Sequence, residues 1–211
     1  MSGYITDPLA IEKKSMQIIE EELGSRADRF SPEELALVKR VIHTTADFEY
    51  ADLFHSAHEA IGSALETFRS GSFDVVSDTN MIVAGTSKNL LSKYGGRIHC
   101  LVADRETQSL AEEQKVTRSM INIRRAVAGY PRAIFAIGNA PTALYELIDQ
   151  IEKGAAEPRL VIAVPVGFVE ARESKEALEK VAVPQITIRG RKGGSTVAVA
   201  ILNALLRLAG E

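Results

Sequence analysis

The sequence predicts an α/β fold: a three-layer, doubly wound, five-stranded parallel sheet preceded by a helical N-terminal extension. Five short apolar segments are continuous rather than alternating, which is typical of strands buried on both faces. Stretches with helical spacing separate them, as parallel strands require. Helical spacing also covers the first 70 residues. Since we find no repeat or linker, we expect one domain over 1–211, with a helical part at 1–70 and a sheet part at 71–211.

Three helices are expected in the N-terminal part. Apolar residues recur at roughly helical spacing over 9–23. The second helix begins with a capping box, in which Ser31 is the N-cap and Glu34 follows three residues later. It should end near His43. A third helix is predicted over 52–68.

The sheet part alternates between the two kinds of element. The expected strands are 73–77, 98–103, 133–137, 160–166 and 185–189. The expected helices are 87–94, 107–128, 141–153, 173–182 and 195–209. A break in the second of these would make Thr117 a helix cap and place Arg118 in the first turn of a new helix, where it could bind a carboxylate.

Ligands of open parallel sheets bind beyond the carboxyl ends of the strands, and two segments there resemble anion sites. In IGNAPTAL, free backbone N–H groups at the start of a helix would point toward a ligand. In RGRKGGST, Arg189, Arg191 and Lys192 surround glycines, and Ser195 is a good N-cap for the last helix. The alternatives are an ordinary strand-to-helix turn for the first segment and a cationic surface loop for the second.

Composition excludes several classes of protein. The 211 residues are 45% hydrophobic, with 25 basic and 28 acidic side chains and a net charge of −3, which argues against a dedicated nucleic-acid binder. The longest apolar run, 160–169, is far too short for a membrane span, and the N-terminus has no signal pattern. A single cysteine, Cys100, forbids an internal disulfide and indicates the cytoplasm. Walker A and GxGxxG motifs are absent from the sequence, as is a flavodoxin-type phosphate loop.

The histidines are the main titratable candidates. His55 and His58 could share one face of the expected third helix, but two histidines are a weak metal site. His99 and Cys100 are interpreted as structural residues within a strand. His43 is at a helix C-terminus, where the helix dipole favours the imidazolium form and a general acid becomes possible, although an ordinary helix-end histidine is the alternative.

Six blocks then occur in one order: VIHTTADFEYADLF, DTNMIVAG, VTRSMINIRRA, AIGNAPTAL, PVGFVEARESK and RGRKGGSTVAVAILNAL. Together, over about residues 4–209, they resemble the precorrin-8X methylmutase family, also called cobalt-precorrin-8 methylmutase. The resemblance implies a flavodoxin-like homodimer that moves a methyl group from C-11 to C-12 of a corrin macrocycle. The product would be hydrogenobyrinate, or cobyrinate when the ring holds cobalt. No cofactor and no metal ligand is implied for the protein.

The resemblance also implies site residues. The family's catalytic histidine matches His43, and a proton from its imidazolium could polarise the conjugated ring. The substrate carries acetate and propionate arms, so arginines and helix N-termini are natural partners. The expected substrate contacts are Ser15, Arg40, Arg118, Asn139, Thr142 and Arg189.

One departure from the family and two alternative functions remain. Glu170 and Arg172 stand where many family members have small residues, and a pair between Glu170 and Arg172 or a lysine would neutralise the extra carboxylate. A non-catalytic tetrapyrrole carrier of the same fold would share the binding residues but lack turnover. A nucleotide- or flavin-binding regulator is disfavoured by the missing phosphate loops.

Overall fold

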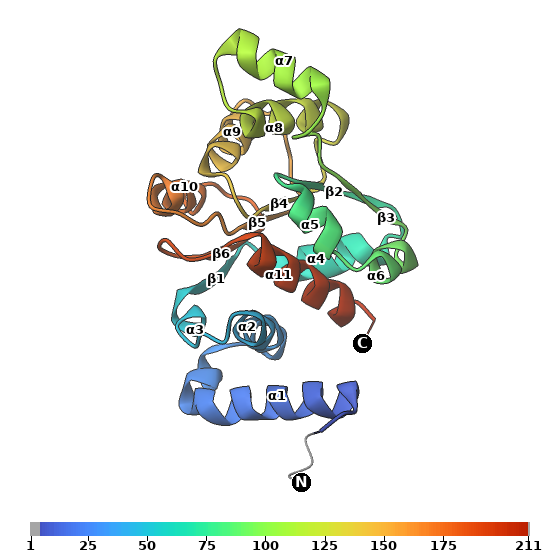
Figure 1. Ribbon diagram of the computed structural model, residues 1–211, viewed down its shortest axis with the longest axis vertical. Helices are drawn as coiled ribbons and strands as arrows, with labels where there is room; N and C mark the ends of the chain where they lie inside the picture. Colours follow the sequence, from blue (N-terminus) through green and yellow to red (C-terminus); the bar gives the residue numbers. More distant parts are fainter. Residues whose placement is uncertain (1–4, 211) are drawn as a thin grey trace.

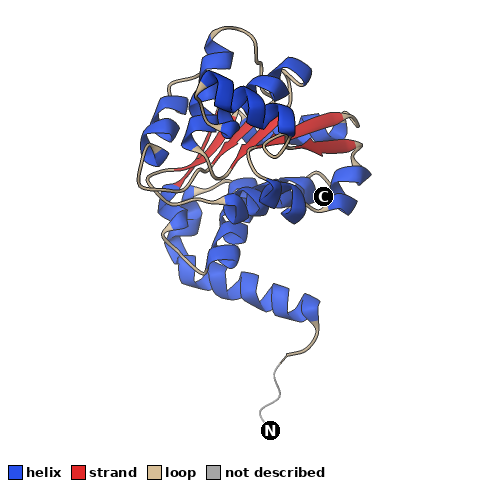
Figure 2. Cartoon of the chain, turned by 45° about the horizontal axis from the view of Figure 1, so that its top comes forward, coloured by secondary structure: helices blue, strands red, loops and turns tan. Residues whose placement is uncertain are grey.

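A computed structural model describes residues 5–210 and contains a mixed six-stranded sheet between helices (Figures 1 and 2). The strands are β1 (Phe54–Ala57), β2 (Phe73–Ser77), β3 (Gly96–His99), β4 (Ile134–Ile137), β5 (Leu160–Ala163) and β6 (Gln185–Ile188). Their spatial order is β1-β6-β5-β4-β2-β3, with β1 antiparallel to β6 and all other pairs parallel. The parallel strands alone follow the flavodoxin-like order 2-1-3-4-5. The predicted parallel sheet is therefore confirmed, with one strand added.

The helices form two layers and an extension. They are α1 (Pro8–Leu23), α2 (Pro32–Thr45), α3 (Tyr50–Leu53), α4 (Ala60–Arg69), α5 (Asn80–Gly85), α6 (Lys88–Lys93), α7 (Arg105–Gln114), α8 (Arg118–Gly129), α9 (Pro141–Glu152), α10 (Ala171–Leu178) and α11 (Ser195–Leu208). Helices α4, α5, α6 and α11 cover one face of the sheet, while α8, α9 and α10 cover the other (Figure 1). Alternate strand residues supply the two cores: Ile134 packs on the first side and Phe135 on the second. Within residues 5–210, no helix has the length and apolarity to cross a membrane.

The N-terminal extension stacks beneath α11. Helix α2 packs against α11, and α1 packs against α2 (Figure 1). The capping box at the start of α2 is confirmed, because Ser31 Oγ accepts from Glu34 N at 3.2 Å and Glu34 Oε2 accepts from Ser31 N at 3.1 Å. A short 3₁₀ helix (Gly24–Arg29) joins α1 to α2. Helix α1 buries only Ile19 and Leu23, both near its C-terminal end.

The predicted helix over 52–68 is wrong in its first half. The chain there forms α3, strand β1 and then α4. His58 and Glu59 both adopt left-handed backbone conformations, with φ of 55° and 54°, which no α-helix can accommodate. β1 pairs instead with the edge of the sheet, with Phe54 opposite Ile188. The helical spacing that suggested one long helix belongs to α4 alone.

Other boundaries also shift. The second parallel strand covers 96–99 rather than 98–103, because Leu101 N donates to the side chain of Asn122 at 2.7 Å instead of to a strand neighbour. Cys100 therefore follows β3 and is half-buried. Helix α5 was not anticipated by the sequence. The break at Thr117 is confirmed: its hydroxyl accepts from Met120 N at 3.2 Å and caps α8.

Candidate active site

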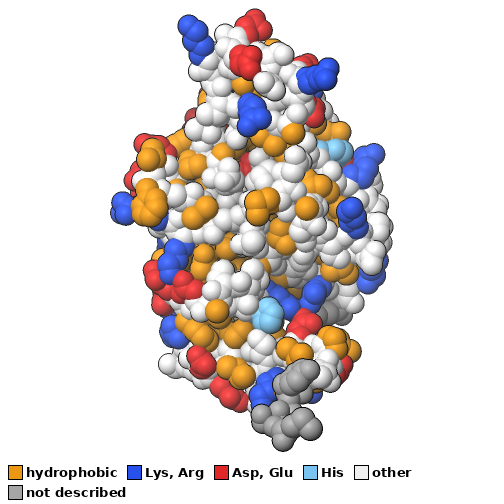
Figure 3. All heavy atoms as spheres, viewed as in Figure 1, with side chains coloured by type: hydrophobic (Ala, Val, Ile, Leu, Met, Phe, Trp, Pro, Cys, Tyr) orange, Lys and Arg blue, Asp and Glu red, His pale blue; other side chains and the backbone are white. Residues whose placement is uncertain are grey.

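His43 lies in the last turn of α2 and faces a cavity of about 280 Å³ between α2, α5 and α11. The lining residues are Arg40, His43, Thr44, Met81, Gly85, Ser195, Thr196, Val199, Ala200, Asn203, Ala204 and Arg207. On the face shown in Figure 3, a histidine side chain lies beside basic and acidic side chains over the lower helices. A second, more apolar groove of about 390 Å³ meets His43 from the side of α1. The imidazole thus stands between a cavity with two arginines in its wall and a more apolar groove.

The His43 ring is held by α1. Ser15 Oγ and His43 Nδ1 lie 2.8 Å apart, the distance of a hydrogen bond. No described residue hydrogen-bonds Nε2. When the ring is doubly protonated, Nδ1–H donates to Ser15 Oγ and Nε2 carries the proton that can be given away. This geometry fits a proton donor that a second residue orients.

Two arginines of the cavity share one carboxylate. Arg40 of α2 and Arg207 of α11 both donate to Oε1 of Glu12, Arg207 at 2.9 Å. These hydrogen bonds hold the pKa of Glu12 below its usual value, and the bond from Arg40 has the larger effect. No motif in the sequence marks Glu12 or Arg207. They are distant in sequence, so only the packing of α1 and α11 around α2 reveals them.

The backbone N–H groups of the turn after β4 bind a carboxylate side chain of the protein itself. Asp78, at the end of β2, is buried and accepts hydrogen bonds from the backbone N–H groups of Gly138, Asn139 and Ala140 at 3.0, 2.8 and 2.7 Å. Burial raises the pKa of Asp78, and the three donors oppose that rise. The expectation that these N–H groups point toward a ligand is therefore wrong, because the carboxylate of Asp78, at the end of the neighbouring strand, occupies them.

Three predicted contacts meet at this edge of the sheet. The hydroxyls of Thr117 and Thr142 lie 3.0 Å apart, which places the start of α8, with the exposed Arg118, beside the start of α9. Asn139 lies exposed in the turn before α9. A Cβ on Gly138 would meet Ser195 Cα at 2.8 Å, so the same turn touches the wall of the His43 cavity. Arg118, Asn139 and Thr142 thus lie beyond one strand edge, and none of them lines the His43 cavity.

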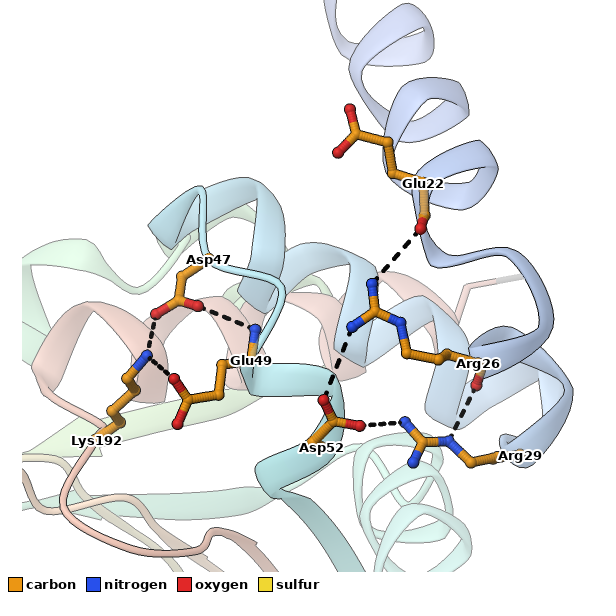
Figure 4. A network of polar contacts seen from close by, with 7 residues as sticks. All are labelled: Glu22, Arg26, Arg29, Asp47, Glu49, Asp52 and Lys192. Carbon is orange, nitrogen blue, oxygen red and sulfur yellow. Dashed lines mark hydrogen bonds and ion pairs between the residues drawn. The ribbon is translucent and has the colours of Figure 1, made fainter.

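The basic loop after β6 is largely neutralised by acidic side chains. Arg189 forms a two-pronged pair with Glu179, with distances of 2.9 and 3.0 Å, and is not part of the His43 cavity. Lys192 binds Asp47 and also Glu49, at 2.7 Å, which ties the loop to the segment after α2 (Figure 4). The hydrogen bond to Asp47 is the main cause of a raised pKa of Lys192, and the bond to Glu49 adds to it. Arg191 lies over the Phe168 ring at 5.7 Å.

The expected cap of the last helix is also corrected. Gly194 is the N-cap, with φ of 121°, and Ser195 is the first helical residue without a capping hydrogen bond. Ser195 also forms part of the cavity wall. A second group of ion pairs in Figure 4 holds α3 to the 3₁₀ helix. Arg26 and Arg29 of the 3₁₀ helix bind Asp52 of α3 at 3.7 and 2.7 Å.

Comparison with known protein families matches residues 10–208 to precorrin-8X methylmutase. The chain belongs to the precorrin-8X methylmutase family. It is 48% identical over 204 residues to the cobalt-precorrin-8 methylmutase of Priestia megaterium, covering 96% of this chain and 88% of that one. It is 35% identical over 206 residues to the precorrin-8X methylmutase of a Sinorhizobium species, covering 97% and 96%. The crystal structure of precorrin-8X methylmutase from Thermus thermophilus superposes with a TM-score of 0.86 at 39% identity, covering 95% and 98%.

Membership of the methylmutase family identifies the chain as an enzyme, an isomerase of cobalamin biosynthesis.

Glu170, where this chain departs from many family members, has a hydrogen-bond partner in this structure. Tyr145 donates its hydroxyl proton to Glu170 Oε2 at 2.7 Å, whereas Arg172 pairs with Glu176 at 2.6 Å. Of the two pairings that would neutralise Glu170, the one with Arg172 is therefore not formed. Burial and then the Glu170 carboxylate raise the pKa of Tyr145 to about 12.

The remaining histidines of this methylmutase are placed away from the cavity. His99 Nε2 lies 2.7 Å from Asp74 Oδ1, and its ring stacks on Tyr130 with centroids 4.1 Å apart, as expected for a structural histidine. His55 is in β1 and His58 in the following turn, so the two do not share a helix face. Over residues 5–210, no three His, Cys, Asp or Glu side chains converge as a metal site would require.

Proposed function

We propose that the enzyme moves a methyl group from C-11 to C-12 of a corrin macrocycle, with His43 as the proton donor. The observation that carries the proposal is the Ser15–His43 hydrogen bond, which orients the imidazole at the junction of the arginine-lined cavity and the more apolar groove. The apolar side, with Ile11, Ile18 and Phe48, suits the flat face of a macrocycle. The other side contains Arg40 and Arg207, which suit its carboxylate arms.

The proposed chemistry needs one mobile proton. His43 Nε2 donates the proton to the conjugated ring system, which becomes electron-poor and lets the methyl group migrate from one carbon to its neighbour. The proton then returns to His43, so the product has the same mass and charge as the substrate. The protein supplies the acid, its orientation and a groove that holds the ring against it.

The substrate contacts follow the distribution of charge. Arg40 reaches the His43 cavity directly, and Ser15 acts through the imidazole. Arg118, Asn139 and Thr142 lie beyond the strand edge and could hold arms that extend past Ser195. Arg189 would have to share its guanidinium between Glu179 and an arm, which makes it the weakest of the six.

The relatives support a cobalt-containing substrate. The relative from Priestia megaterium, at 48% identity, is named for cobalt-precorrin-8, whereas the Sinorhizobium relative, at 35%, is named for precorrin-8X. We therefore propose cobalt-precorrin-8 as the better substrate and cobyrinate as its product. Parallel assays with the two substrates test this, and a higher kcat/KM for the metal-free ring would contradict it.

We also propose that the enzyme is a cytoplasmic homodimer. The lone cysteine is consistent with a reducing compartment. Apolar side chains that a partner could cover are exposed at two places: Leu9 is 76% exposed on α1, and Phe168 and Val169 are 86% and 80% exposed before α10. Sedimentation equilibrium measures the mass directly. A monomer at micromolar concentration would contradict the proposal.

The deciding experiment follows the visible spectrum of substrate mixed with purified protein. The shift changes ring conjugation, so turnover should change absorbance with time while the mass of the tetrapyrrole stays constant. A spectrum that is perturbed at once and then stays fixed would favour a non-catalytic tetrapyrrole carrier. No change with either the metal-free or the cobalt substrate would contradict both.

A further inference from the structure

The pair of arginines in the His43 cavity is already occupied by a carboxylate of the protein. Arg40 comes from α2 and Arg207 from the last turn of α11, and both donate to the same oxygen of Glu12. Two guanidinium groups converging on one oxygen form a carboxylate site. The site lies in the wall of the cavity that contains His43.

Glu12 lies in the part of α1 that has no buried side chain. Within residues 8–18 of the helix no side chain is buried, and the buried anchors, Ile19 and Leu23, come later. Glu12 is also one turn before Ser15, so the residue that binds the two arginines and the residue that binds His43 project from one helix face. The side chain of Glu12 is 34% exposed and can turn toward solvent.

We propose that Glu12 is an internal stand-in for a substrate carboxylate, and that Arg40 and Arg207 exchange it for an acetate or propionate arm of the macrocycle. The inference rests on the proposed function, because it requires a polyanionic substrate. It adds Arg207 to the binding residues and makes Glu12 a competitor of the substrate. In the empty enzyme Glu12 balances the charge of two adjacent arginines. In the complex an arm of the ring takes over that role.

The exchange predicts the direction in which loss of the Glu12 charge changes the affinity for the ligand. Glu12 is ionised at neutral pH, because both arginines hold its pKa down. A substrate arm therefore has to displace a charge-assisted pair, which weakens net binding. Removing the charge in Glu12→Gln takes away the competitor and should tighten binding of hydrogenobyrinate by about two- to fivefold, the worth of a partly exposed ion pair. The same variant should melt at a lower temperature, because the free enzyme loses two ion pairs.

The experiment titrates hydrogenobyrinate into wild-type enzyme, Glu12→Gln and Arg207→Gln, and follows the visible spectrum. Glu20→Gln is the matched control: Glu20 pairs with Lys39 at 2.5 Å, also between α1 and α2, but Lys39 is not in the His43 cavity. Tighter binding by Glu12→Gln, weaker binding by Arg207→Gln and unchanged binding by Glu20→Gln are expected.

The contrary outcomes are distinct. If Glu12 merely holds the two arginines in place, Glu12→Gln will bind the ligand more weakly, and the inference is overturned. Unchanged affinity in Glu12→Gln or in Arg207→Gln also overturns it. If wild-type enzyme binds neither hydrogenobyrinate nor cobyrinate, the proposed function itself fails and the inference fails with it.

Discussion

Ser15 Oγ lies 2.8 Å from His43 Nδ1, so a side chain of the N-terminal helix orients the imidazole at the end of α2. The two residues are 28 positions apart in the sequence. The bond engages one ring nitrogen and leaves Nε2 for chemistry, because a neutral or protonated imidazole uses its two nitrogens separately. Helix α1 thus contributes a residue to the candidate active site.

Replacing the orienting hydroxyl should slow turnover more than it weakens binding. Ser15→Ala removes one hydrogen bond to His43, and we expect kcat to fall roughly fivefold to tenfold with KM little changed. Ser15→Thr keeps a hydroxyl and should restore most of the rate. Steady-state assays on the visible spectrum of the tetrapyrrole measure both. Equal loss in the two variants would show that packing, not the hydroxyl, matters.

The sheet was predictable from the sequence because its strands are buried on both faces. Segments such as 133–137 contain only apolar residues, and β4 is fully buried on both sides. The sixth strand was not predictable. β1 has four half-buried residues, including His55 and Ser56, and its neighbours have helical spacing. Only the left-handed turn at His58 and Glu59 separates it from α4, and neither residue is a glycine or asparagine that would signal such a turn.

Lys175 should make stability depend on pH in the alkaline range. The residue is buried, donates to Lys192 O at 2.8 Å, and burial lowers its pKa from 10.5 to about 8. Below pH 8 both folded and unfolded chains carry the charge, and the cost of burying it is constant. Between about pH 8 and 10.5 the unfolded chain binds more protons, so the contribution of Lys175 to the free energy of unfolding rises with pH, in total by about 3 kcal/mol.

Lys175→Met should abolish that rise. Urea unfolding near pH 7 and near pH 10 gives the free energies, and the difference between wild type and variant isolates the lysine from other titrating groups. Lys180→Met, at an exposed position just after α10, is the control and should preserve the wild-type pH dependence. A pH profile of Lys175→Met that parallels the wild type would contradict the assigned pKa direction.

Glu170 adopts a left-handed backbone conformation, with φ of 61°, that costs a non-glycine residue about 1 kcal/mol. It is partly compensated by the hydroxyl of Tyr145. Glu170→Gly relieves the strain and Glu170→Ala retains it, while both lose the hydrogen bond. We expect the glycine variant to be more stable than the alanine variant by about 1 kcal/mol in urea unfolding. Equal stabilities would show that the position is unstrained.

Gly193 holds the loop after β6 against the end of β5. A Cβ there would lie 2.2 Å from Val164 O, at a φ of 151°. Gly193→Ala should therefore cost about 2 kcal/mol or more and lower activity, since the loop borders the His43 cavity. Gly190→Ala is the matched control: φ is 74°, but no atom lies within 4 Å of its Cβ. If both variants lose the same stability, the close approach at Gly193 has no energetic role.

Parts of the active site could be predicted and parts could not. The position of His43 followed from the helix end and the family resemblance, and the structure adds its partner. The turn after β4 has the residues of an anion site, but the sequence could not show that Asp78 of another strand fills it. Glu12 and Arg207 form their cluster through packing of α1, α2 and α11, and no local pattern marks either of them.

The most direct test of the account is to separate turnover from binding at His43. His43→Asn removes the acid but keeps a polar side chain of similar reach. We expect its turnover of cobalt-precorrin-8 to fall at least about a hundredfold, the lower range for loss of a general acid, while affinity for the product stays at the wild-type value. A variant that retains most of the wild-type turnover would contradict the role of His43 as proton donor.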